Sequence, residues 1–160
     1  MKNIILIGCL LGALVSQIPA SASMPPLQAS KGDSYPLHSV NGLTLDDDPA
    51  AVADKLGKPQ NVVQDEWLAE LQIYEYTDMD IAFRDGWLDY VEISGGADVL
   101  QIDGNELPAT EAAIREALGQ PDFIAEDGIV FQRGEALLKL FIDPHTGKLQ
   151  SIAYYHIASV

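Results

Sequence analysis

Histidines and carboxylates are the residues of this sequence whose chemistry could support catalysis or metal binding. The three histidines, His38, His145 and His156, lie far apart in the chain. No two of them have the spacing of a helical zinc site, and no glycine-rich loop could cradle a phosphate. A Gly-x-Ser-x-Gly nucleophile elbow is also absent from the sequence. The sequence therefore predicts no cofactor, no metal site and no catalytic residue, while a cluster of histidines formed by folding stays open.

The abundance of carboxylates supports a second interpretation, a small secreted hydrolase. Glycosidases need only two carboxyl groups at a suitable distance, and Asp78, Asp80, Asp85 and Asp89 could supply them. These residues fall at predicted turns and strand edges, where aspartate commonly binds the local backbone. The run 46–48 could offer oxygen ligands for weak calcium binding, but it matches no twelve-residue calcium loop. Capping of the following helix is a simpler role for this run.

Aromatic residues form the most informative remaining group. Strand alternation places Tyr74 and Tyr76 on one face of a strand and Leu71 and Ile73 on the other. Aromatic side chains rimmed by charge are typical of recognition surfaces. The alternative is that the whole aromatic set packs under the helices; the set comprises Trp67, Tyr74, Tyr76, Trp87, Tyr90, Tyr154 and Tyr155. We predict a binding surface on the side of the sheet away from the helices, formed by Tyr74, Tyr76, Trp87 and Tyr90.

The composition limits the kinds of partner. The chain has 160 residues with 9 Lys+Arg against 24 Asp+Glu, which gives a formal net charge of −15. Nucleic acid binding draws its affinity from Lys and Arg, so nucleic acid is excluded as a partner. Anionic membrane surfaces are disfavoured for the same reason. Apolar residues make up 48% of the chain, enough to bury the core of one domain.

The first 22 residues predict export. Lys2 precedes an apolar stretch from Ile4 to Val15, and small residues ending in Ala22 follow, as in a secretory signal peptide. The stretch is too short to be retained as a membrane helix, so we expect no membrane insertion after signal removal. A lipidation motif ending at Cys9 is the alternative. Cleavage after Ala22 would leave a mature chain without cysteine, which fits a bacterial protein that is secreted or held in the periplasm or cell envelope.

A repeated segment organises the rest of the chain. Residues 48–59 read DPAAVADKLGKP and residues 110–121 read TEAAIREALGQP, so the offset is 62 residues. Each copy predicts a short helix, with Asp48 or Thr110 as the N-cap. Gly57 and Gly119 are the expected left-handed C-caps, because glycine adopts that conformation without a Cβ clash. Residues 23–40 are rich in proline and serine and predict an exposed linker.

Three β-prone runs follow each predicted helix. They are 71–76, 80–83 and 87–93 in the first copy, and 128–132, 136–142 and 149–155 in the second. Short turns between the runs predict antiparallel meanders. The predicted fold is therefore α+β: two tandem αβββ units, residues 41–96 and 97–160, with short helices packed on one face of an antiparallel meander sheet.

The repeated helix ends carry a family resemblance. The motif Leu-Gly-x-Pro stands at 56–59 and 118–121, each time before an aromatic-rich meander. Over residues 41–160 the chain resembles the tandem-repeat family typified by the secreted β-lactamase inhibitor protein, and the related SmpA/OmlA outer-membrane-assembly domain. The resemblance implies protein binding through a concave sheet, and it does not imply β-lactamase inhibition. The inhibitor proteins carry disulfides and the assembly proteins a lipid anchor, and neither is predicted here.

The sequence thus favours an exported, non-enzymatic interaction module that binds an unknown protein partner through an aromatic, acidic sheet face. The small hydrolase with paired carboxylates is one alternative. An envelope structural protein without a single ligand is the other. Converging carboxylates of shifted pKa in a pocket would favour the hydrolase, whereas an exposed aromatic patch would favour binding.

Overall fold

The computed structural model describes residues 35–159. The predicted signal peptide, Cys9 and the first part of the predicted linker lie outside the described residues. Within the described residues, no helix is long and apolar enough to cross a membrane.

Two eight-residue helices form where the repeated segments predict them, α1 at Pro49–Leu56 and α2 at Glu111–Leu118. Their predicted N-caps are confirmed. The Asp48 carboxylate accepts a hydrogen bond from Ala51 N at 2.7 Å, and the Thr110 hydroxyl accepts one from Ala113 N at 3.2 Å. Helices this short are marginal in isolation, so each depends on the apolar face that it packs on the sheet.

The glycines that end the helices adopt a more demanding conformation than predicted. Gly57 has φ 80° and ψ −166°, and Gly119 has φ 86° and ψ −148°. These angles lie outside the left-handed helical region and in a region that is essentially restricted to glycine. The sequence predicted the right residue at each cap, but the backbone turns back toward the sheet instead of continuing as a left-handed turn.

Four strands of the large sheet, not three, follow each helix. The first half contains β1 (Asn61–Gln64), β2 (Leu71–Glu75), β3 (Met79–Arg84) and β4 (Trp87–Ser94). The second half contains β7 (Phe123–Ala125), β8 (Gly128–Arg133), β9 (Ala136–Ile142) and β10 (Leu149–His156). The extra strands, β1 and β7, come directly after the helices and are exposed along their length. Sequence patterns missed them because short edge strands lack the alternation of buried residues.

All eight strands form one antiparallel sheet in the order β1-β2-β3-β4-β10-β9-β8-β7. Each half contributes one continuous meander, and the halves meet where β4 pairs with β10. A separate hairpin of β5 (Val99–Ile102) and β6 (Asn105–Pro108) connects the halves, and a 3-10 turn (Ile157–Ser159) ends the described chain. The fold is therefore α+β, with an antiparallel meander sheet and two short helices.

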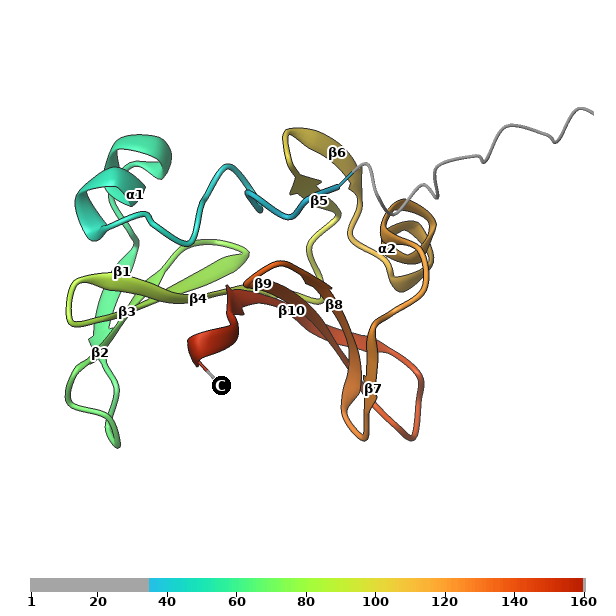
Figure 1. Ribbon diagram of the computed structural model, residues 1–160. Coiled ribbons are helices and arrows are strands. Elements are labelled where there is room, and N and C mark those ends of the chain that lie inside the picture. The colour runs from blue at the N-terminus through green and yellow to red at the C-terminus, as the bar shows by residue number, and fades with distance from the viewer. Residues whose placement is uncertain (1–34, 160) are drawn as a thin grey trace, which may run out of the picture.

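Both helices and the β5–β6 hairpin lie on the same side of the sheet (Figure 1). The outer strands of both halves bend away from the helices, so the opposite side of the sheet is concave (Figure 1). The main core fills the space between helices and sheet. It includes Val52 from α1, Ile114 and Leu118 from α2, and the buried sheet residues that face them.

The segment 35–40 belongs to the fold, in contrast to the predicted linker. Leu37 and Val40 are 1% and 0% exposed and are part of the main core. The Tyr154 hydroxyl donates to Leu37 O at 2.9 Å, and Asp103 accepts hydrogen bonds from the backbone of the same segment. The prolines and serines of residues 23–40 obscured two isolated apolar residues that have no periodic pattern.

Candidate binding face

The register of the sheet determines which side chains face the helices. Directly paired residues of antiparallel strands project to the same side. Tyr74 pairs with Ile81, Ile81 with Val91, and Val91 with Tyr154. This row continues through Leu138 to Phe131. Except for Tyr74, which packs against the core from the row's outer end, every member of this row is buried in the core, so the row faces the helices.

Tyr74 and Tyr76 are therefore not on the predicted surface. The Tyr74 ring packs edge-on against Phe83, with 4.9 Å between the ring centroids. The Tyr76 hydroxyl donates to Gly57 O, at the end of α1, at 3.1 Å. Alternation correctly separated these tyrosines from Leu71 and Ile73, but the assignment of the two faces was inverted. Tyrosine suits the helix side here because its hydroxyl reaches a helix-terminal carbonyl that lacks an intrahelical partner.

We define the helix-free face as the side of the eight-stranded sheet opposite α1 and α2. Tyr90 and Tyr155 are paired neighbours on this face, where β4 meets β10. Both rings are half-buried. Aliphatic side chains extend the same row in both directions, so that an apolar row crosses the sheet: Ile73, Ala82, Tyr90, Tyr155 and Leu137.

Trp87 lies on the helix-free face at the start of β4, paired with Arg84. Its side chain is 65% exposed. Arg84 Nη2 lies 3.0 Å from Asp89 Oδ2, so the guanidinium of the paired residue is held by an ion pair. Of the four predicted binding residues, the structure thus brings Trp87 and Tyr90 to the helix-free face and places Tyr74 and Tyr76 on the helix side.

A row of carboxylates runs beside the apolar row. Glu75 pairs with Asp80, and Asp80 pairs with Glu92, so three like charges lie opposite one another on adjacent strands. Partial burial and then the charges of Glu75 and Glu92 raise the pKa of Asp80 above its usual value. Burial, and then a set of carboxylates led by Glu92, also raises the pKa of Tyr90. The first half of the face is therefore strongly acidic.

The second half of the helix-free face has its charge neutralised internally. Lys139 Nζ lies 2.8 Å from Asp127 Oδ2 and 4.3 Å from the centroid of the Phe141 ring. The hydrogen bond from Lys139 lowers the pKa of Asp127. An ammonium group held between an aromatic ring and a carboxylate is a favourable arrangement. The two halves thus differ in charge, although their strands occupy mirrored positions.

Sequence reasoning missed Tyr155, the residue that completes the aromatic pair of this face. Tyr154 and Tyr155 are adjacent, so one of them must face the helices and the other the opposite side. Tyr154 is 1% exposed, and its hydroxyl bonds to Leu37 O and His38 O. The alternation of residues 149–155 indicates that Tyr154 and Tyr155 lie on opposite faces of the sheet. It does not indicate which of the two faces the helices.

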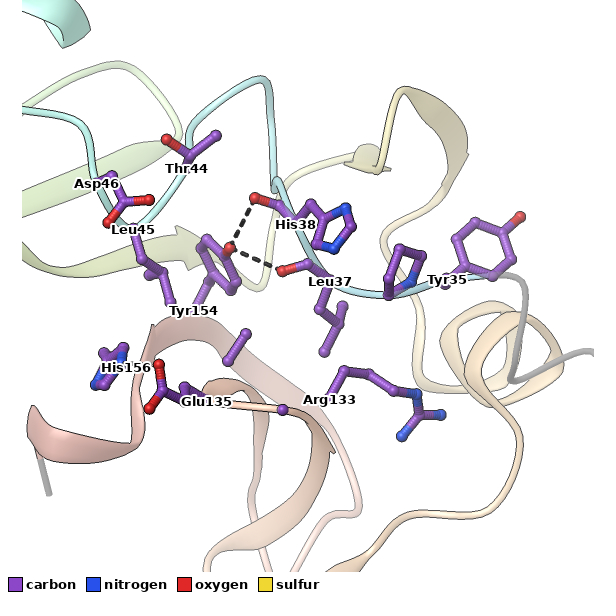
Figure 2. A pocket seen from close by; sticks show the side chains of 13 residues that line it. Tyr35, Leu37, His38, Thr44, Leu45, Asp46, Arg133, Glu135, Tyr154 and His156 are labelled. Atoms are coloured by element: carbon purple, nitrogen blue, oxygen red, sulfur yellow. Dashed lines mark hydrogen bonds and ion pairs between the residues drawn. The ribbon is translucent and has the colours of Figure 1, made fainter.

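A separate cavity of about 580 Å³ lies on the helix side, between the segment 35–38 and the β8–β9 turn. Figure 2 shows Tyr154 within it, bonded to Leu37 O and His38 O. His156 Nδ1 accepts from Ala158 N at 3.0 Å, so Nε2 carries the proton toward Glu135 Oε2, 3.3 Å away. The other polar lining includes Arg133, which donates to Leu118 O at the end of α2. These polar groups bind other parts of the chain, and among them Tyr154 holds the segment 35–38 in place.

The run 46–48 supports local structure. Asp48 caps α1, and the buried Asp47 carboxylate accepts from Thr44 N and from Lys55 Nζ. Burial alone would raise the pKa of Asp47, but Lys55 and Thr44 outweigh it and hold the pKa below its usual value. Among residues 35–159, no group of three or more His, Cys, Asp or Glu side chains is arranged to hold a metal ion.

The sequence matches no known protein-family model and no curated protein. Among solved structures, a cysteine-rich secretory protein from Staphylococcus aureus is similar, with 12% identity, a TM-score of 0.46, and coverage of 74% of this chain and 46% of that one. The chain thus spans about half the length of the staphylococcal protein. A DUF4309 family protein from Bacillus subtilis is also similar, with 15% identity, a TM-score of 0.46, and coverage of 72% of this chain and 83% of that one.

Proposed function

We propose that this chain is an exported, non-enzymatic interaction module that binds a protein partner through its helix-free face. The observation that carries the proposal is the pairing of Tyr90 with Tyr155 at the junction of the two halves. The helices leave this side of the sheet free, and the paired rings offer rigid contact area at a low cost in side-chain entropy. Trp87 adds an exposed indole to the same face.

The charge of the face specifies the partner further. Glu75, Asp80 and Glu92 lie next to the tyrosines, and the whole chain has a formal net charge of −15. A partner with a basic surface would be attracted over a long range and would relieve the repulsion among the three carboxylates. The proposed partner is therefore a protein that presents lysine or arginine beside an apolar patch.

We also propose that the two halves are tandem copies of one helix-and-meander unit, related to the predicted αβββ unit with one further edge strand. The 62-residue offset of the helix segments supports this proposal. The mirrored strand order about the β4–β10 pair supports it as well. In such an arrangement, the junction between copies creates a surface that neither copy has alone, and Tyr90 and Tyr155 lie there.

Photo-crosslinking from the face tests this function. A benzoylphenylalanine placed at Tyr155 in the full chain, expressed in its own host, should trap one discrete protein. The same group at Glu116, an exposed residue of α2, should not trap it. With the trapped protein purified, Tyr90→Ala and Tyr155→Ala should each weaken binding at least tenfold, and the association rate should fall as salt rises. Equal trapping from both positions, or unchanged affinity in both variants, would refute the proposal.

One observation favours the hydrolase as a second candidate. Asp80 and Glu92 both line a shallow hollow of about 290 Å³, and the pKa of Asp80 is raised. A carboxyl group with a raised pKa beside a second carboxyl group is the kind of pair that general acid–base catalysis uses. Turnover of nitrophenyl glycosides by the wild-type protein, abolished in both Asp80→Asn and Glu92→Gln, would favour the hydrolase over the binding module.

A further inference from the structure

The loop between β1 and β2 differs from its counterpart in the second half. It spans residues 65–70, whereas β7 and β8 are joined by residues 126 and 127 alone. Insertions in one copy of a repeated unit commonly carry a binding function. The inserted residues read Asp-Glu-Trp-Leu-Ala-Glu, with three acids and no cation.

The insertion is held in one conformation by its own hydrogen bonds. The Asp65 carboxylate accepts from Trp67 N at 2.8 Å and from Leu68 N at 2.7 Å. Leu71 N donates to Leu68 O, and the Gln64 side chain donates to Ala69 O and Leu71 O. Even so, the Trp67 side chain is 90% exposed. The loop therefore holds a large aromatic side chain in solvent, with its backbone already ordered.

The neighbouring strand β1 lies at the edge of the sheet, where it pairs with β2 and with no second strand among residues 35–159. Asp65 N donates to Leu71 O, so Asp65 points its backbone toward β2. Because this orientation alternates along an antiparallel strand, Val63 and Asn61 also point inward. Val62 and Gln64 consequently direct their N–H and C=O groups away from the sheet. Val62 and Val63 are 51% and 37% exposed, so the edge is apolar on both faces. Natural proteins often protect an edge strand with a lysine or a proline, and β1 contains neither.

We propose that the β1 edge and the Trp67 loop bind an extended, basic segment of a partner protein by strand addition. The segment would pair with the outward backbone groups of Val62 and Gln64. Its lysine or arginine side chains would lie against Trp67 and the carboxylates of Glu66 and Glu70, which combines a cation–π contact with charge complementarity. The acidic loop disfavours an anionic membrane, and the net charge of −15 disfavours a second copy of the chain. This site is separate from the helix-free face and uses none of its tyrosines.

A peptide provides the test. The probe is an acetylated, amidated heptapeptide of alternating basic residues and valine, Lys-Val-Arg-Val-Lys-Val-Arg, titrated into the full exported chain. In a Trp87→Phe background, Trp67 is the sole tryptophan, so its emission reports burial by the peptide directly. We expect saturable binding with a blue shift of that emission. A proline-centred peptide of the same charge should bind at least tenfold more weakly, because it cannot pair along its length.

Variants separate strand addition from simple charge attraction. Val62→Pro removes an outward N–H and leaves the inward pairing of β1 intact, so it should weaken binding at least tenfold, as should Trp67→Ala. Ile124→Pro makes the matched change on the opposite edge and should stay within twofold of wild type. Equal affinity across all variants, absence of binding, a dimer that Val62→Pro dissolves, or Trp67-dependent binding to phosphatidylcholine vesicles would each overturn the proposal. Tyr90→Ala should not affect peptide binding. The strand-addition proposal can therefore fail while the proposal for the helix-free face stands, and the reverse also holds.

Discussion

Asn41 and Asp103 each bind the backbone of the segment that carries the other. Asn41 Oδ1 accepts from Gln101 N at 2.9 Å, while the Asp103 carboxylate accepts from Leu37 N, His38 N and Ser39 N at 2.9, 2.7 and 3.0 Å. Each residue has positive φ and precedes a glycine with positive φ, as in a type I′ turn. Asp103 follows Asn41 by 62 residues. The 62-residue offset of the helix segments thus recurs upstream of them, in two turns that contact each other reciprocally.

Removing the Asp103 carboxylate should open this contact. Asp103→Ala leaves three backbone N–H groups without their acceptor, and we expect a loss of about 2–3 kcal/mol in the free energy of unfolding. Asp103→Asn keeps one acceptor oxygen and should lose less. Urea denaturation gives the values, and hydrogen exchange should quicken at Leu37–Ser39. Asp98→Ala, at an exposed position in the same connection, is the control, and a similar loss there would contradict the assignment.

The glycines that end the helices should tolerate no side chain. A non-glycine residue in their backbone region costs about 1–3 kcal/mol, so Gly57→Ala and Gly119→Ala should each lower the free energy of unfolding by that amount. Space is not the cause at Gly57, because an added Cβ would meet nothing within 4 Å. Thermal unfolding of the two variants decides the matter. If both are neutral, the caps do not have the conformation described.

Gly95 tests a different constraint, the close approach of backbone where the two halves meet. Its N–H donates to Gln150 O, and a Cβ there would lie 2.4 Å from the same oxygen. Gly95→Ala must therefore separate β4 from β10, and we expect a loss above about 2 kcal/mol. Gly96→Ala is the matched control, because its Cβ would make only an ordinary contact with Ser94. Circular dichroism melts that coincide for the two variants would argue against a tight junction.

The parts of the fold that sequence could predict are those with a local cause. Asp48, Thr110 and the two cap glycines act within a few residues of the backbone groups they serve, so their types and spacing identify the helices. The face of Tyr74 depends instead on its pairing with Ile81 on the adjacent strand β3, and a shift of one residue in that register would invert it. Tyr76 is placed by a carbonyl of Gly57, which no spacing rule connects to it. Leu37 is held by hydrogen bonds to Asp103 and Tyr154, 66 and 117 positions away in the sequence.

The helix-free face could be predicted from the sequence only in part, because local patterns identify some of its residues and tertiary pairing determines the others. Trp87 and Tyr90 were found from composition and strand position, because both are large aromatics in the predicted β4 run. Tyr155 required knowledge that β10 lies beside β4, which follows from the tertiary meeting of the halves and not from either run alone. The acidic row has this origin too, since Asp80 pairs with carboxylates from two different strands.

The last prediction follows from the acidic row and concerns how stability depends on pH. The pKa of Asp80 is raised from its ordinary value of 3.8, so the folded state disfavours the ionised form. The penalty is absent below pH 3.8 and is fully present above the raised pKa. Asp80→Asn removes it, and the variant should therefore gain stability over wild type as pH rises through this window. Urea denaturation of both proteins between pH 3 and pH 8 measures the difference.

Asp127→Asn provides a control of opposite sign. Lys139 lowers the pKa of Asp127, so this carboxylate contributes stability above its unfolded pKa, and the contribution is lost as pH falls through the folded pKa. Asp127→Asn should thus destabilise at neutral pH and converge with wild type in acid. A pH-independent difference for Asp80→Asn would mean that burial and the neighbouring carboxylates do not raise the pKa of Asp80. If they do, ionised Asp80 destabilises the folded state, and a basic partner would neutralise that same charge. Asp80→Asn should then bind the partner more weakly while folding more stably.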